Sequence, residues 1–244
     1  MEFRIEIAGK VIGISSLYDE VYDLCKGYYT EDSEDFHVTT SESDIQFEHD
    51  KSISEAIFEG NPPYEYEKSY YETLAVYRKI AVKMLQYDTW LMHGAVVATK
   101  DMGAVIFTAP SGIGKTTHMK LWLEHIPGAF VVNGDKPLIR LSSAGYEVCG
   151  TPWAGKEGLQ TNTIMPLKAV CFIERGEVNQ LDQMTYSDAY PMLIQQTYRP
   201  SDKFEMSKTL SLIMDFGRTV PLYRMKCNMN PEAAYKAYEV ISSI

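Results

Sequence analysis

One stretch of the sequence combines glycines, a lysine and a threonine at a spacing that suits phosphate binding. Residues 109–116 read Ala-Pro-Ser-Gly-Ile-Gly-Lys-Thr, which fits G-x-x-x-x-G-K-[ST] except that alanine stands first. Gly112 and Gly114 would let the backbone bend so that successive N–H groups face phosphate oxygens. Lys115 would supply a positive charge for the outer phosphates. Thr116 would present a hydroxyl to Mg²⁺ at the positive end of a helix.

The sequence on either side of this loop predicts the elements that the motif requires. A buried strand over residues 104–108 precedes it, and a helix over residues 117–126 follows with apolar residues at helical spacing. Without that context the loop would be an ordinary helix N-terminus that happens to carry lysine and threonine. His118, in the first turn of the helix, is expected to face solvent. We therefore expect ATP and Mg²⁺ as cofactors, with the triphosphate bound by Ser111, Gly112, Ile113, Gly114, Lys115, Thr116 and Thr117.

Three other side chains are candidates for chemistry next to the loop. Asp135 follows a predicted strand, where an acid can hold Mg²⁺ or take a proton from an attacking hydroxyl; alternatively it belongs to an Asn-Gly-Asp turn. His93 precedes the strand that leads toward the loop, although a single histidine is more often structural. Lys156 lies in the stretch Gly-Thr-Pro-Trp-Ala-Gly-Lys, which could bind phosphate through the lysine or form a surface turn anchored by Trp153.

The rest of the chain predicts hairpins around these residues and no regular alternation of strand and helix. Residues 1–60 are expected to form short strands and turns, including a strand over residues 44–47. The Asn-Pro-Pro at residues 61–63 breaks the chain, which suggests a small acidic module over residues 1–66 and a nucleotide-binding domain over residues 67–244. Further strands are predicted at 95–98, 129–132, 138–141, 146–149, 166–174 and 221–227, and helices at 68–85, 185–196, 203–216 and after Asn230.

Composition excludes several classes of function. The net charge is −10, and the first 80 residues hold 18 acidic against 7 basic side chains, which argues against nucleic-acid binding there. No run of eighteen apolar residues is present, so no membrane span is expected. The first residues lack the basic-then-apolar pattern of a signal peptide, and the four cysteines are widely separated. These features favour a cytoplasmic protein with reduced cysteines.

The order of these motifs resembles the HPr kinase/phosphorylase and ATP-dependent phosphoenolpyruvate carboxykinase superfamily, especially its HPr-kinase-like bacterial branch. The resemblance covers roughly residues 68–240. It implies an α/β fold with a P-loop in a mixed, hairpin-rich sheet, beside a small N-terminal α+β module. The matching segments are residues 93–94, 107–118, 133–137, 150–156, 166–169 and 221–227.

The resemblance also implies roles for individual residues. Lys115 would hold the β- and γ-phosphates and Thr116 the metal, with His93 near the transferred phosphate. Asp135 would match the second of two adjacent acids, but Gly134 stands where the family has the first. In the family one acid binds the metal and the other acts as the base for the acceptor hydroxyl. Here Asp135 could perform one of these roles while another group performs the other, or the hydroxyl could need no strong base. A third alternative is that the chain binds nucleotide without transferring phosphate.

Three functions remain open from the sequence. The leading hypothesis is a kinase that transfers the γ-phosphoryl group to a hydroxyl of a peptide, a protein serine or a small molecule. The second is a catalytically silent nucleotide-binding sensor or pseudokinase, and the third, ranked last, is a carboxykinase. The sequence does not identify the acceptor, although the acidity of the N-terminal module would suit a basic one. Related kinases assemble, so a homo-oligomer is possible.

Overall fold

The computed structural model describes residues 1–58 and 60–244 and divides the chain into two compact units. The first unit is Met1–Lys83 and the second is Met84–Ile244. The sequence predicted a domain boundary after residue 66, before helix α3 (Lys68–Met84). In the structure the boundary between the two units falls after Lys83, at the end of that helix.

The first unit combines a three-stranded sheet with three helices. Strands β1 and β2 form an antiparallel hairpin, and β2 pairs with β3 in parallel. Five aliphatic side chains from these strands are at most 1% exposed and form the core of the unit: Ile5, Ile7, Ile12, Ile14 and Val38. The elements besides α3 are β1 (Glu2–Ile7), β2 (Lys10–Ser15), α1 (Asp19–Leu24), β3 (Phe36–Thr39) and α2 (Glu42–Phe58).

A buried carboxylate on α3 explains why this helix belongs to the first unit. Glu72 is 0% exposed and accepts hydrogen bonds from the backbone N–H groups of Leu17 at 2.6 Å and Tyr18 at 2.8 Å. The hydroxyl of Thr40 also donates to this carboxylate. Helix α3 therefore satisfies the polar backbone groups at the end of β2, and a carboxylate is a strong acceptor for such groups.

The prediction of a strand over residues 44–47 was wrong, because these residues lie in α2. The Ser41 N–H donates to the Asp44 carboxylate at 3.1 Å, which is half of a capping box and a local signal for a helix start. Asp44 also forms an ion pair with Lys79 of α3 at 2.7 Å, and Glu48 pairs with Arg78. Acidic side chains one turn apart thus face basic side chains of α3, a pattern that a strand would not produce.

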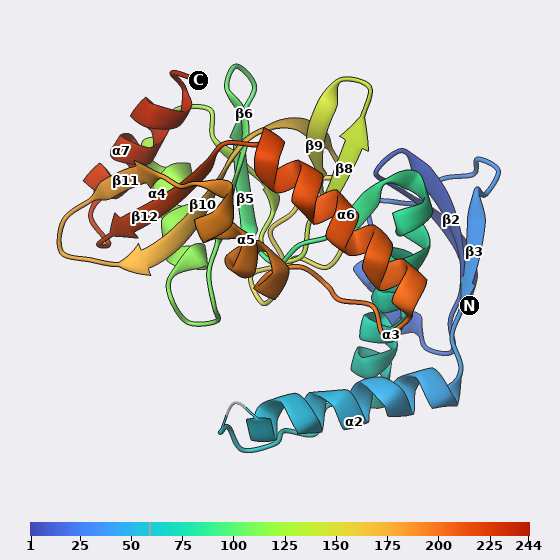
Figure 1. Cartoon of the computed structure of the whole chain (residues 1–244). Coiled ribbons are helices and arrows are strands. Elements are labelled where there is room, and N and C mark those ends of the chain that lie inside the picture. The colour runs from blue at the N-terminus through green and yellow to red at the C-terminus, as the bar shows by residue number, and fades with distance from the viewer. Residues whose placement is uncertain (59) are drawn as a thin grey trace. The chain divides into compact units, whose positions relative to one another are not determined.

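The second unit is built on a mixed, nine-stranded sheet within the described residues (Figure 1). The path runs β4-β8-β9-β10-β6-β5-β7, and β12 pairs with β10 and β11. Strand β10 is parallel to β6 and β12, whereas the other pairings are antiparallel. The strands are β4 (Thr89–Leu91), β5 (Ala95–Thr99), β6 (Gly103–Thr108), β7 (Phe130–Asn133), β8 (Leu138–Ser142), β9 (Gly145–Cys149), β10 (Ile164–Arg175), β11 (Gln180–Gln183) and β12 (Leu222–Cys227).

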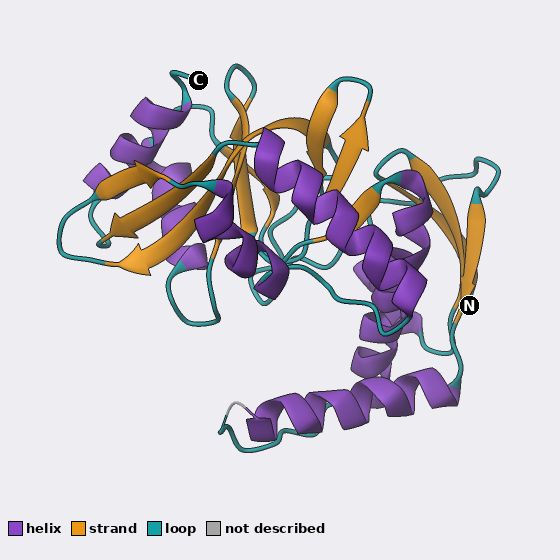
Figure 2. Ribbon diagram, viewed as in Figure 1, coloured by secondary structure: helices purple, strands orange, loops and turns teal. Residues whose placement is uncertain are grey.

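Helices cover both faces of this sheet (Figure 2). Alternate side chains of the central strands enter two cores. On β6, Ile106 packs in the core that includes α5 and α6, and Phe107 in the core that includes α4 and α7. The alternation follows from the two-residue period of a strand, and burial on both faces explains the continuous apolar runs. The helices are α4 (Lys115–His125), α5 (Tyr186–Gln195), α6 (Lys203–Thr219) and α7 (Pro231–Ile241), besides the short 3-10 helix η1 (Leu85–Tyr87).

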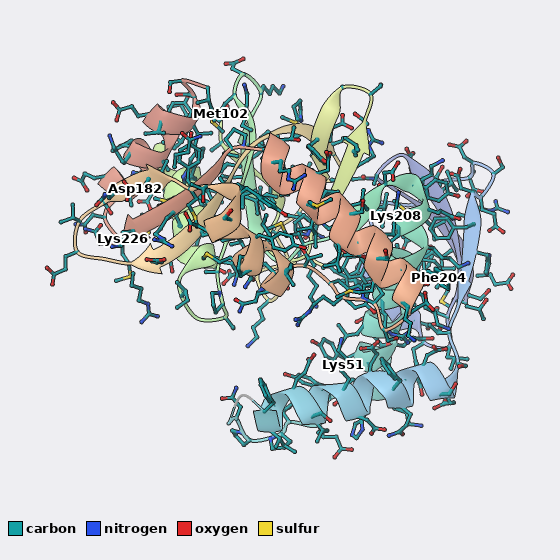
Figure 3. All side chains as sticks on the ribbon, in the orientation of Figure 1. Lys51, Met102, Asp182, Phe204, Lys208 and Lys226 are labelled. Carbon is teal, nitrogen blue, oxygen red and sulfur yellow. The ribbon has the colours of Figure 1, made fainter. Side chains whose placement is uncertain are left out.

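The mixed, hairpin-rich sheet and the separate small α+β unit confirm the expected α/β class. The predicted hairpin turn before residue 104 joins β5 to β6 around Met102, which Figure 3 labels. Strands β3, β4 and β11, which have four, three and four residues, were not predicted. No helix among the described residues combines the length and apolar character that crossing a membrane requires.

Candidate functional site

The glycine-rich loop, residues 109–116, connects the buried strand β6 to helix α4. Gly112 has φ +77° and Gly114 φ +131°, which are conformations that L side chains rarely adopt. A Cβ built at either position meets nothing within 4 Å. Glycine is therefore required here by backbone conformation and not by lack of space.

Lys115 turns back over the loop that carries it. Its ammonium group donates hydrogen bonds to the carbonyl oxygens of Ala109 at 2.8 Å and Pro110 at 3.4 Å. The residue is 9% exposed, and this burial lowers the pKa of the ammonium group, an effect that the negative charge of Asp135 partly offsets. The carboxylate of Asp135 thus acts electrostatically on the Lys115 ammonium group.

Asp135 occupies the turn that follows β7. The side-chain oxygen of Asn133 accepts the N–H groups of Asp135 at 2.9 Å and Lys136 at 2.7 Å, so the turn chemistry foreseen for Asn-Gly-Asp is present. The Asn133 amide also donates to the Thr151 carbonyl at 3.0 Å. The Asn133 side chain thereby fixes the backbone at Asp135 and links the turn to the segment that follows β9.

His93 lies against Asp135. Its Nε2 is 3.1 Å from Asp135 Oδ1, and its Nδ1 is 3.1 Å from Gln196 Oε1. The main chain reinforces both contacts, because the His93 N–H donates to the Gln196 carbonyl at 2.6 Å and the Gly94 N–H to the Asp135 carbonyl at 2.8 Å. The structure thus brings Asp135 and His93 together and adds Gln196. The sequence offers no signal for Gln196, which is 103 residues away from His93.

The surroundings of Asp135 keep its carboxyl group ionised. Burial acts to raise the pKa, but the hydrogen bond from His93 and the charges of His93, Lys136 and Lys115 together outweigh it, so the pKa lies below the usual 3.8. At neutral pH the site therefore presents a carboxylate next to the Lys115 ammonium group.

The segment after β9 packs against the position where the sequence lacks an acid. A Cβ built on Gly134 would lie 2.7 Å from the Ala154 carbonyl oxygen and 3.3 Å from that of Leu159. Trp153 in this segment is 5% exposed, so it serves as a buried anchor. Lys156 is exposed on the turn, and the residue before it, Gly155, packs against Asp135: a Cβ built on Gly155 would lie 3.0 Å from the Asp135 Cβ. Glu157, which follows Lys156, pairs with Lys120 of α4 at 3.0 Å.

A pocket of about 450 Å³ borders the other flank of the glycine-rich loop. The loop and the first turn of α4 line one side, including Ile113 and Thr117. The ends of β10 and β12 line the opposite side, with Ile173, Arg175 and Met229 among the lining residues. The pocket is thus partly apolar and opens next to the backbone N–H groups of a helix start.

His118 is buried, contrary to the expectation that it faces solvent. It is 2% exposed, and its Nε2 accepts a hydrogen bond from Trp122 Nε1 at 3.1 Å. Burial lowers the pKa of the imidazole to about 3, so the ring is neutral at physiological pH. His118 belongs to the core that includes Phe107, whose ring it contacts edge-on.

The donors available for a metal ion are few. The described residues contain no group of three or more His, Cys, Asp or Glu side chains arranged to hold one. The Thr116 hydroxyl and the Asp135 carboxylate are hard oxygen donors. This donor set fits Mg²⁺, which usually takes one or two protein ligands and completes its shell with phosphate oxygens and water.

The comparisons with known proteins find matches among solved structures. No protein-family model matches the chain, and no curated protein matches it. Among solved structures, the chain is similar to the Hpr(Ser) kinase/phosphatase from Coxiella burnetii, with a TM-score of 0.38 and 11% sequence identity. The match covers 64% of this chain and 99% of that one. A likeness of this degree is a distant one of fold and assigns no residue a role.

Proposed function

We propose that the chain binds Mg-ATP on the glycine-rich loop and transfers the γ-phosphoryl group to a hydroxyl of a peptide, a protein serine or a small molecule. The observation that carries the proposal is the placement of Asp135 beside a loop whose two glycines have positive φ. Asp135 is 3.1 Å from His93, and the His93 carbonyl accepts the hydroxyl of Thr108, the residue just before the loop, at 2.7 Å. Backbone N–H groups at a helix start and a lysine favour phosphate, and an ionised acid beside them favours its metal ion.

The order of strands supports one orientation of the nucleotide. Strand β6 carries the loop; β5 and β7 on one side lead to His93 and Asp135, and β10 and β12 on the other side border the pocket. A triphosphate lying across the loop would have its terminal phosphate near Asp135. Its nucleoside would then enter the pocket beside Thr117 and Ile113.

The residues have distinct parts in the proposed transfer. Lys115 would exchange its two carbonyl partners for the outer phosphates. Thr116 and Asp135 would hold Mg²⁺, which would neutralise phosphate charge. The acceptor oxygen forms a bond to the γ-phosphorus as the bond to the β-phosphate oxygen breaks and ADP leaves. The hydroxyl proton passes to the Asp135–His93 pair or to water. Because the transition state is loose, positioning and charge neutralisation supply most of the catalysis.

A second candidate, a nucleotide-binding sensor without catalysis, rests on Gly134. The Ala154 carbonyl occupies the space that a side chain at this position would need, so a second acid has no room. If transfer requires two acids, the same site would bind Mg-ATP and keep it intact.

The test is a calorimetric titration of Mg-ATP into the wild-type protein and into Lys115→Ala. Loss of a charged hydrogen-bond donor is expected to weaken binding on the order of a hundredfold. Lys236→Ala on α7, where Lys236 pairs with Glu239 at 3.2 Å, removes the same charge from the surface and is expected to bind normally.

The same samples distinguish the two candidates when mixed with a degenerate serine-containing peptide library and radiolabelled ATP. Lysine-dependent ADP formation with label on peptide supports a kinase. Binding without ADP formation favours the sensor. An absence of Mg-ATP binding by the wild-type protein contradicts both.

A further inference from the structure

Arg175, at the end of β10, reaches across to the glycine-rich loop. Its guanidinium group donates a hydrogen bond to the Gly112 carbonyl at 2.6 Å and a second, from Nε, to the Ile113 carbonyl at 3.3 Å. Both acceptors precede the first residue of α4, so their carbonyl groups lie outside the hydrogen-bond ladder of the helix. The guanidinium group of one side chain thus donates hydrogen bonds to two consecutive peptide carbonyls.

These contacts fix the direction of two backbone donors. In a trans peptide the C=O and the following N–H point in opposite directions, and the described residues contain no cis peptide bond. When Arg175 holds the Gly112 and Ile113 carbonyls toward itself, the N–H groups of Ile113 and Gly114 must point away from it. They are then directed to the side of the loop that lies away from Arg175, where a bound phosphate could accept them.

Orientation is the main consequence of these hydrogen bonds. Gly112 is exposed and Arg175 is exposed, so water could satisfy the same carbonyls without the arginine. Because Gly112 and Gly114 have no Cβ, this short stretch has more accessible conformations than ordinary residues would have. A bidentate arginine removes that freedom, whereas a lysine, which is a point charge, cannot hold two peptide planes at once.

We propose that Arg175 is a positioning residue: it pre-orients the Ile113 and Gly114 N–H groups for phosphate and is not itself a phosphate ligand. The inference rests on the proposed function, because it needs phosphate to bind in this loop. It goes beyond that function by giving a role to a residue on a strand that contributes nothing to the motif.

The test uses inorganic tripolyphosphate as the probe, with calorimetry and backbone amide NMR. Arg175→Met is expected to bind on the order of tenfold more weakly than wild type. Arg175→Lys is expected to recover little of this loss. The control is Lys226→Met on the neighbouring strand β12 (Figure 3), which removes a charge opposite Glu174 and is expected to bind as wild type does.

The amide signals separate positioning from direct contact. In Arg175→Met without ligand, the Ile113 and Gly114 amide resonances are expected to shift and broaden while those of α7 stay in place. Unchanged amides in the free variant, or full recovery by Arg175→Lys, would overturn the positioning role in favour of direct contact or simple charge. Equal binding by wild type and Arg175→Met overturns the inference alone. A wild-type protein that does not bind tripolyphosphate overturns the proposed function as well.

Discussion

His93 Nε2 lies 3.1 Å from Asp135 Oδ1, and the Gly94 N–H donates to the Asp135 carbonyl at 2.8 Å. Two segments that the sequence places on separate strands are therefore joined by a side-chain pair and a backbone hydrogen bond. Because β5 and β7 are neighbours in the sheet, the start of one and the end of the other meet beside the glycine-rich loop.

This pairing predicts that His93 and Asp135 act as one unit in phosphoryl transfer. Asp135→Asn and His93→Ala are each expected to lower the transfer rate on the order of a hundredfold, because the acceptor hydroxyl and the metal lose a fixed partner. The double variant is expected to lose scarcely more than Asp135→Asn alone. A double-mutant cycle on the single-turnover rate measures this, and additive losses would show that the two residues act independently.

The close packing around Gly134 leads us to expect that an aspartate introduced at this position will be poorly tolerated. Gly134→Asp places a Cβ 2.7 Å from the Ala154 carbonyl, so the segment after β9 must move. We expect both Gly134→Asp and Gly134→Ala to lower the free energy of unfolding by about 1–3 kcal/mol, as overpacking does. Urea titration measures the cost.

A comparison of Gly134→Ala with Gly134→Asp identifies the cause of the destabilisation. If sterics decide, alanine and aspartate destabilise to a similar extent, and neither raises the transfer rate. A stable Gly134→Asp protein with faster transfer would show that the missing acid was the limitation.

His118 predicts a loss of stability in mild acid. Its folded-state pKa is about 3, against 6.5 in the unfolded chain, so only the unfolded state gains a proton as the pH falls below 6.5. The contribution of this site is thus complete above pH 6.5 and declines toward pH 3. By pH 5 the decline amounts to roughly 2 kcal/mol.

Urea unfolding of wild type and His118→Gln at pH 7 and pH 5 measures the contribution of His118 to the pH dependence of the free energy of unfolding. Glutamine keeps an acceptor for the Trp122 indole N–H and does not titrate. The variant is therefore expected to lose less stability between the two pH values, and an equal loss would place the acid sensitivity elsewhere.

Glu72 predicts a stability effect confined to the first unit. Glu72→Ala leaves the N–H groups of Leu17 and Tyr18 without their acceptor and is expected to cost about 2–3 kcal/mol. Glu72→Gln keeps one acceptor oxygen and is expected to cost less. Hydrogen exchange at the Leu17 and Tyr18 amides measures the change, and slow exchange at both in Glu72→Ala would contradict the assigned role.

Many of the local elements and the glycine-rich loop could be predicted from the amino-acid sequence. Continuous apolar runs identified β5, β6 and β10, and Asn230 followed by proline marked the start of α7, because these signals depend only on neighbouring residues. The glycines at 112 and 114 likewise indicated a backbone with positive φ. Where a local signal was overlooked, as with the capping residues Ser41 and Asp44, the prediction of a strand failed.

The contacts between residues far apart in the sequence could not be predicted, because they depend on tertiary packing. The contact of Gln196 with His93, the reach of Arg175 across to the loop, and the Ala154 carbonyl over Gly134 all depend on strand order and segment packing. Tertiary packing also buried His118, because its helix face is set by the contact with Phe107 on β6. The local sequence pattern specifies the backbone conformation of a residue. Its tertiary contacts depend on which strands and helices pack together, and the burial of apolar side chains over the whole unit determines that packing.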